Sequence, residues 1–384
     1  MKYTLVIAEK TSVAQSIAAV IGATKRYDGY LEGSDYIVSW CVGHLVELST
    51  ADSYDERYAK WQYADLPIIP QNWQYSISRG KEKQMKIIDE LMHRKDVNII
   101  IAATDAGREG ELIFRLVYEK NSCNKPVKRL WISSMEEKAI SDGFQNLRDS
   151  KHYDNLYRSA LCRAKADWIV GINSTRLFSV LYGQTLNVGR VMSPTLSMIV
   201  EREASISAFV TELFYTVQLD CGVFTLSCEK LANKQIAESL CKSCDGQNII
   251  IQSVENKEKS EKPPKLYDLT TLQREANRKL GFIAEQTLSY TQSLYEKKLV
   301  TYPRTDSRYL TSDISENTPP VIKAIAGLFM SQDTSFTVSM ELVTDNSKVN
   351  DHHAIIPTMS IQNYDIASLP FGEREILLLI SLRL

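Results

Sequence analysis

Residues 302–307, Tyr-Pro-Arg-Thr-Asp-Ser, carry side chains that could cut a nucleic-acid backbone. Pro303 biases Tyr302 towards an extended conformation. Residues two apart in an extended chain point the same way, so the Tyr302 hydroxyl and the Arg304 guanidinium can share one phosphate. A tyrosine, with an ordinary pKa of about 10, needs nearby positive charge to attack a phosphodiester. The alternative, a strand-edge tyrosine with a surface arginine, is the commoner reading of a bare Tyr-x-Arg.

Acidic residues follow two predicted buried strands. Glu9 follows the apolar run 3–8, and Asp105 follows the run 97–103. Such strands with helical crossovers predict a parallel sheet, at whose carboxyl edge Glu9 and Asp105 converge. Glu109, with Glu111, lies at the start of the next predicted helix, 112–120. Clustered carboxylates favour a hard cation such as Mg²⁺. The alternative for the last two acids is the ordinary preference for helix N-termini.

Basic and aromatic residues recur through the predicted helix 156–178, in a pattern suited to single-stranded DNA. The alternative is a solvated helix face with a core tryptophan. The polar loop that starts at Asn187 precedes a predicted helix, 194–203, and its Gly189 would let the backbone approach a phosphate. The residues concerned in the first helix are Arg158, Arg163, Lys165, Trp168 and Arg176.

Composition bounds the class of protein. The chain has 384 residues, 44% hydrophobic and 24% charged, which suits a globular protein of two to four domains. No apolar run approaches the roughly 18 residues of a membrane span, and Glu9 and Lys10 interrupt the only candidate leader. Seven scattered cysteines fit a reducing cytosol, and zinc at Cys241 and Cys244 is the minor alternative. Because the net charge is −2, any DNA contact must come from local basic clusters.

Several motifs, in order along the chain, resemble the type IA DNA topoisomerases, and within them most closely the bacterial topoisomerase III group. Ile7-Ala8-Glu9-Lys10 and Asp105-Ala106-Gly107-Arg108-Glu109-Gly110-Glu111 resemble the two acidic motifs of a Toprim domain. The others are Gly43-His44-Leu45, Ala166-Asp167-Trp168, Asn187-Val188-Gly189-Arg190-Val191, Tyr302-Pro303-Arg304-Thr305-Asp306 and Asp351-His352-His353-Ala354-Ile355-Ile356-Pro357-Thr358.

The resemblance implies a role for each of these residues. Tyr302 would attack one DNA strand and form a 5′-phosphotyrosyl link, and resealing would need no ATP. Arg304 and His352 would contact the scissile phosphate, and Lys10 and Glu9 would assist the reaction. Glu9, Asp105 and Glu109 would hold Mg²⁺, although Gly107 replaces a second acid of the motif and leaves a looser site. The implied DNA-binding residues are Trp61, Arg163, Lys165, Asp167, Trp168, Arg176, Asn187, Val188, Gly189, Arg190, Val191, Met192 and Arg304.

The resemblance also implies an architecture. A Toprim α/β domain, a parallel sheet with flanking helices, would be followed by mainly α and β arch domains of a multidomain ring, incomplete at the C-terminus. We expect a Toprim domain (1–150), the first part of a helical DNA-binding domain (151–212), the first part of a β-rich arch or hinge domain (213–268), a winged-helix-like domain carrying Tyr302 (269–355) and a return segment (356–384).

Three functional readings follow. The first is a type IA topoisomerase that acts on single-stranded and negatively supercoiled DNA in the cytoplasm, on a nucleoid or a plasmid. The second is a truncated remnant that binds or cleaves DNA without efficient strand passage. The apolar helix 373–384 would then expose Leu377, Leu378 and Ile380 and promote self-association. The third, a Toprim nuclease or primase-like enzyme, is disfavoured by the motifs around Tyr302 and His352.

Overall fold

The structure, a computed structural model, describes residues 2–132, 135–329, 338–349 and 352–384. It divides into two compact units. Met1–Val188 and Pro263–Leu384 form the first, and Gly189–Lys262 forms the second. Asp351 of the predicted motif lies outside the described residues. Among those described, no helix combines the length and apolarity that a membrane crossing requires.

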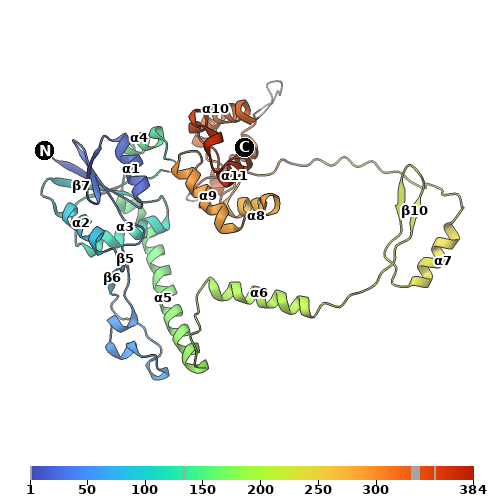
Figure 1. Cartoon of the computed structure of the whole chain (residues 1–384), viewed down its shortest axis with the longest axis horizontal. Coiled ribbons are helices and arrows are strands. Elements are labelled where there is room, and N and C mark those ends of the chain that lie inside the picture. The colour runs from blue at the N-terminus through green and yellow to red at the C-terminus, as the bar shows by residue number, and fades with distance from the viewer. Residues whose placement is uncertain (1, 133–134, 330–337, 350–351) are drawn as a thin grey trace. The chain divides into compact units, whose positions relative to one another are not determined.

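The first unit is built on a seven-stranded sheet of order β2-β3-β4-β1-β7-β8-β9 (Figure 1). The central strands β4, β1, β7 and β8 run parallel, as expected, whereas β2, β3 and β9 pair antiparallel at the two edges. The sheet is therefore mixed, because the Asp28-Gly29 turn folds β2 and β3 into a hairpin. The strands are β1 (Tyr3–Ala8), β2 (Lys25–Tyr27), β3 (Tyr30–Glu32), β4 (Tyr36–Trp40), β7 (Val97–Ala103), β8 (Val127–Arg129) and β9 (Arg148–Asp149).

Helices cover both faces of this sheet because successive side chains of a strand point to opposite faces. Val6 of β1 packs with α1 (Thr11–Val20) and α4 (Glu137–Gln145) on one face. Leu5 packs with α2 (Glu82–His93) and α3 (Arg108–Lys120) on the other. The expected helix 112–120 begins about one turn earlier than predicted, so Glu109 and Glu111 lie in its first turn.

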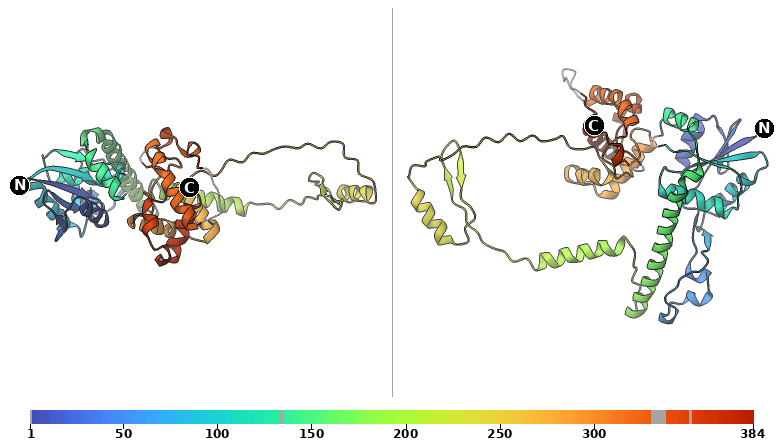
Figure 2. Two further views of the ribbon diagram at one scale, coloured as in Figure 1. Left: turned by 90° about the horizontal axis from the view of Figure 1, so that it is seen from above. Right: turned by 180° about the vertical axis from the view of Figure 1, so that it is seen from behind.

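A two-stranded arm extends from the sheet beside the long helix α5 (Asp154–Tyr182), as Figures 1 and 2 show. The arm comprises β5 (Val46–Leu48), β6 (Tyr75–Ile77) and the loop between them. Side chains of α5 bond to its backbone: Trp168 Nε1 donates to Ser49 O at 2.9 Å, and Arg176 donates to Tyr58 O at 2.8 Å. The arm is thereby fixed along the helix.

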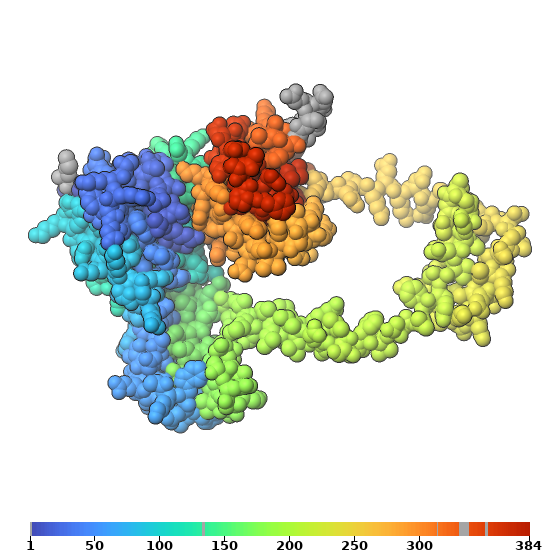
Figure 3. All heavy atoms as spheres, in the orientation of Figure 1, coloured from blue at the N-terminus to red at the C-terminus, as the bar shows by residue number. Residues whose placement is uncertain are grey.

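The C-terminal part of the first unit contains α8 (Leu269–Leu280), α9 (Ala284–Glu296), α10 (Ser312–Phe329) and α11 (Phe371–Ser381). Its core continues into the cluster that covers one face of the sheet, and Figure 3 shows its atoms against those of the sheet part. Short 3-10 helices are η1 (Ala51–Ser53), η2 (Glu56–Ala59), η3 (Tyr63–Asp65), η4 (Ser150–Tyr153), η5 (Glu341–Val343), η6 (Asn346–Lys348), η7 (Met359–Asn363) and η8 (Ile366–Ser368).

The C-terminal helix corrects one expectation. Leu377 and Ile380 are 0% and 1% exposed, and Leu378 is half-buried, so the apolar surface predicted for self-association is not open. α11 packs against α8 and α9. Its Glu373 also accepts hydrogen bonds from Ser293 of α9 and from Lys297, the residue that follows α9.

The second unit comprises α6 (Met192–Ser207), the hairpin of β10 (Gln218–Asp220) and β11 (Thr225–Ser227), and α7 (Lys234–Cys244). Gly222, with φ of +81°, forms the hairpin turn. No helix or strand occupies residues 245–268, which include the connector predicted at 257–265.

Candidate active site

The carboxyl ends of β1 and β7 bring the two predicted acids together. Ala8 and Ala103 pair in the parallel register, and Glu9 and Asp105 follow them. The backbone N–H of Asp105 donates to Glu9 Oε2 at 3.3 Å. The predicted convergence of these acids at the sheet edge is confirmed.

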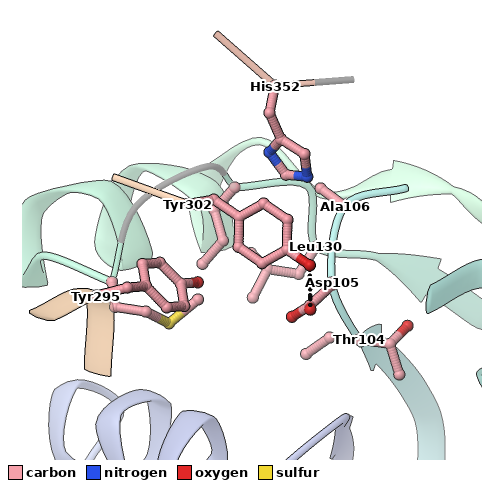
Figure 4. Close-up of a pocket in the computed structure, with 10 residues that line it drawn as sticks. Thr104, Asp105, Ala106, Leu130, Tyr295, Tyr302 and His352 are labelled. Carbon is pink, nitrogen blue, oxygen red and sulfur yellow. Dashed lines mark hydrogen bonds between the residues drawn. The ribbon is translucent and has the colours of Figure 1, made fainter. Parts of the chain in front are cut away.

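Tyr302 reaches the same edge from the C-terminal part. The backbone just before it is paired with the segment after His352: Thr301 N–H donates to Ile356 O at 2.9 Å, and Val300 bridges Pro357. The Tyr302 hydroxyl donates to Asp105 Oδ2 at 2.9 Å (Figure 4). Segments that are distant in sequence thus meet around one phenol.

Two rings enclose that phenol. The Tyr295 ring of α9 meets Tyr302 edge-on, with ring centroids 5.4 Å apart. The His352 ring lies 4.3 Å away, tilted by 37°. The pocket they border has room of about 10 Å³, close to one water molecule. Its other lining residues are Ala103, Thr104, Asp105, Ala106, Leu130, Ile132 and Met135.

The electrostatics of Tyr302 differ from the sequence expectation. Burial, followed by the charge and hydrogen bond of Asp105, raises the Tyr302 pKa well above its ordinary value. Arg304, whose side chain is exposed, lowers that pKa by less than these causes raise it. In this arrangement Tyr302 keeps its proton, and a carboxylate, not a cation, is its immediate partner.

Burial also shifts the pKa of two neighbours. It raises the pKa of Glu9 to about 7, with the nearby charge of Asp105 as the second cause. It lowers the pKa of His352 to about 4, with His353 as the second cause. His352 is therefore neutral at pH 7. Its Nδ1 atom is buried and has no hydrogen-bond partner among the described residues, so with the ring proton on this nitrogen it could donate to an oxygen of a bound phosphate.

Arg129 holds the loop that presents Asp105, and the sequence did not point to it. This fully buried arginine donates to Thr104 O at 2.8 Å and to Asp105 O at 2.7 Å. Its charge is balanced by Glu111, also fully buried, at 3.0 Å. Arginines are rarely this buried, so a short Val-Lys-Arg strand gives no sign of the role. Glu111 is thus an ion-pair partner in the core.

The Toprim acids fit a divalent cation only in part. Glu9 and Asp105 are adjacent oxygen donors whose mutual repulsion a cation would relieve. Glu109 is exposed and faces His44 at 3.8 Å. Within the described ranges, no three His, Cys, Asp or Glu side chains gather as a metal site. Lys10, half-buried, directly precedes α1.

The predicted DNA-binding residues of α5 divide between structural and accessible positions. Trp168 packs edge-on against Tyr54 and Trp73, besides its bond to the arm, which matches the core alternative for this residue. Arg176 is buried and lies over the Trp61 ring at 5.5 Å. Arg163 is exposed, while Lys165 and Asp167 are half-buried.

The loop after α5 keeps an open surface. Val188 N–H donates to Thr175 Oγ1 at 2.9 Å. Gly189 N–H donates to Ser193 Oγ at 3.1 Å. The exposed residues of this loop are Asn187, Arg190, Val191 and Met192. Trp61 on the arm is exposed as well, at 42%.

Comparison with known families identifies the class of protein to which this site belongs. The Toprim domain family matches residues 4–135, and the DNA topoisomerase family matches residues 151–384. The chain therefore belongs to the type IA DNA topoisomerase family, which acts on DNA. The family assignment agrees with the resemblance found in the sequence motifs. Toprim domains of topoisomerases bind a divalent metal.

Individual relatives agree with this assignment. The chain is 44% identical to the DNA topoisomerase 3 of Bacillus cereus, covering 95% of this chain and 52% of that protein. It is 42% identical to the DNA topoisomerase 3 of Bacillus subtilis, covering 100% and 54%. The chain thus spans about half the length of the curated relatives it matches. The full-length topoisomerase I of Thermotoga maritima shares the fold, with a TM-score of 0.72 at 23% identity, over 99% of this chain and 60% of that one.

Proposed function

We propose that this chain takes part in the type IA topoisomerase reaction: transient cleavage of one DNA strand, strand passage and rejoining. Such a reaction relaxes negatively supercoiled DNA or separates linked circles, and in the cytoplasm it would serve a nucleoid or a plasmid. The single observation that carries the proposal is the Tyr302 hydroxyl at 2.9 Å from Asp105, beside Glu9 and the His352 ring.

The Tyr302 oxygen attacks the phosphorus, its proton passes to the Asp105 carboxylate that accepts its hydrogen bond, and a 5′-phosphotyrosyl bond forms. The bond from phosphorus to the 3′ oxygen breaks. Glu9, protonated up to about pH 7, supplies the proton for that leaving oxygen. Arg304 and Lys10 contribute positive charge at the phosphate, and the neutral His352 ring contributes a hydrogen bond. Rejoining is the reverse, so no ATP is consumed.

The covalent step is tested with Tyr302→Phe. We expect the variant to form no covalent adduct with a single-stranded oligonucleotide, while its affinity for that oligonucleotide stays within about twofold, because only the hydroxyl is removed. Denaturing electrophoresis of the labelled strand detects the adduct. Tyr295→Phe is the matched control, since Tyr295 is a neighbouring buried tyrosine that should be dispensable for the bond. An adduct that persists in Tyr302→Phe would show that another residue is the nucleophile.

Mg²⁺ is the cation we propose for Glu9 and Asp105, where it would neutralise the two carboxylates and position the cut ends for rejoining. Chelation with EDTA should therefore suppress rejoining more than cleavage, so that adduct accumulates. Asp105→Asn also removes the proposed proton acceptor of cleavage, so this variant should form less adduct than the unaltered chain, with or without EDTA. The assay follows the amount of adduct after high salt is added to drive rejoining. Equal rejoining with and without EDTA would contradict a metal role for these acids.

A further inference from the structure

A basic patch lies near the tyrosine site in sequence, on the loop that follows Tyr302, the segment that precedes His352 and the segment that precedes α8. We define it as Lys265, Tyr309 and Lys348. The Lys265 Nζ atom lies 5.0 Å from the centre of the Tyr309 ring, and the Lys348 Nζ atom lies 4.7 Å from it. Both ammonium groups also act on the phenol oxygen and lower the Tyr309 pKa, with Lys265 as the larger cause. Two cations and one hydroxyl thus gather at an accessible phenol.

Backbone and side-chain bonds build this patch from three separated segments. Ser307 Oγ donates to Lys348 O at 2.9 Å, which joins the loop after Tyr302 to η6. Arg308 Nε donates to Leu266 O at 3.2 Å, which joins the same loop to the start of the C-terminal part. The two lysines are therefore presented by a fixed framework.

The patch carries an excess of positive charge. Asp345 pairs with Lys348 at 2.7 Å. In the parts of the chain that the structure describes, Lys265 has no ion-pair partner within 4 Å. Two ammonium groups and a hydroxyl, with one carboxylate among them, suit a compact anion that accepts several hydrogen bonds, which is the chemistry of a phosphate.

Position links the patch to the tyrosine site. Tyr309 follows Tyr302 by seven residues in one loop, and Thr305 Oγ1 of that loop donates to His352 O at 2.8 Å. Lys348 precedes His352 by four residues, so at most about 14 Å of extended chain separates their Cα atoms. A strand attached to Tyr302 can therefore reach the patch within a few nucleotides.

We propose that Lys265 and Lys348, on either side of Tyr309, form a phosphate-binding subsite for the DNA strand that Tyr302 holds. The inference rests on the proposed function, because it takes a single DNA strand as the ligand. The two lysines would bind the phosphate backbone of the DNA and would make no contact that distinguishes one base from another.

The experiment compares the salt dependence of single-strand binding. A fluorescently labelled oligonucleotide is titrated with the full chain between 50 and 200 mM salt. For single strands, the logarithm of affinity falls with the logarithm of salt concentration with a slope of about −0.7 for each phosphate neutralised. In Lys265→Ala/Lys348→Ala one phosphate contact is lost, so we expect a slope shallower by about 0.7, and the loss of affinity across this range shrinks about 2.6-fold.

Two matched variants make the result specific. Lys83→Ala/Lys86→Ala removes two exposed, acid-paired lysines of α2 and should keep the wild-type slope. Lys265→Arg/Lys348→Arg keeps both charges and should restore it. A wild-type slope in the alanine pair would overturn the subsite and leave the proposed function standing. If the unaltered chain binds no single-stranded DNA, the proposed function fails, and the subsite with it.

Discussion

At the scale of residues, three acidic groups share one small space. The Tyr302 hydroxyl donates to the Asp105 carboxylate, and the backbone N–H of Asp105 donates to the Glu9 carboxylate. The negative charge of Asp105 therefore lies close to Glu9. A raised Glu9 pKa is the physical consequence. The same arrangement prepares a proton acceptor beside the phenol and a proton donor nearby. The proposed cleavage therefore gives the acid role to Glu9 and the base role to Asp105, two carboxylates that the sequence alone presents as equivalent.

A pH dependence of stability follows from Glu9. In the folded chain Glu9 keeps its proton up to about pH 7, whereas the unfolded side chain releases it near 4.5. Between these values the folded state binds more protons, so its stability is full below about pH 4.5 and is lost as pH rises through about 7, by up to about 3 kcal/mol. Thermal unfolding in EDTA measures this. In Glu9→Gln the decline should be smaller, and an identical decline in both proteins would contradict the shifted pKa.

Some of the site could be predicted from sequence and some could not. Glu9, Asp105 and Tyr302 stand directly after strands or in a distinctive run, so their meeting was predictable. Arg129 and Glu111 were not, because a buried ion pair depends on the packing of β8 against α3, which no local pattern records. From the sequence, a nearby cation was expected to assist attack by Tyr302. Its actual environment depends on how the C-terminal part docks on the sheet edge.

At the scale of elements, α5 and the arm form one assembly. The helix predicted at 156–178 agrees with α5 to within a few residues at each end. The arm residues 49–74 have no helical period, and they are ordered by Trp168, Asn173 and Arg176 of α5. Burial of α11 was missed for a related reason: its partners, α8 and α9, lie far away in sequence.

Two tryptophans of this assembly should respond differently to substitution. Trp61→Ala removes a partly exposed ring that could stack on a base and should cost about 1–3 kcal/mol of single-strand affinity. It also loses the contact with Arg176, so we expect a small decrease in the thermal midpoint. Trp168→Ala removes the bond to Ser49 and two ring contacts, so it should lower the thermal midpoint. Fluorescence titration and circular dichroism measure the two effects. Unaltered DNA affinity in Trp61→Ala would remove this residue from the proposed DNA interface.

At the scale of the whole molecule, the first unit holds Tyr302, the proposed nucleophile, beside a very small pocket. The pocket beside Tyr302 has room for about one water molecule, whereas sites for small ligands occupy roughly 300–1,000 Å³. The residues that close it come from two parts of the unit: Asp105 from the sheet, and Tyr302, Tyr295 and His352 from the C-terminal part. A phosphodiester can reach Tyr302 only if these parts separate.

This separation is measurable by energy transfer between two dyes. One dye is attached at Glu90→Cys on α2 and the other at Arg278→Cys on α8, in a Tyr302→Phe chain whose exposed Cys162 and Cys241 are replaced by serine. We expect a single-stranded oligonucleotide to lower the transfer, because the strand can occupy the site only in an opened arrangement. The control pair, Glu90→Cys with Lys138→Cys, lies within the sheet part and should not respond. Unchanged transfer in the first pair, at saturating DNA, would mean that the strand binds without parting Tyr302 from Asp105, and the closed pocket would then lie outside the path of the DNA.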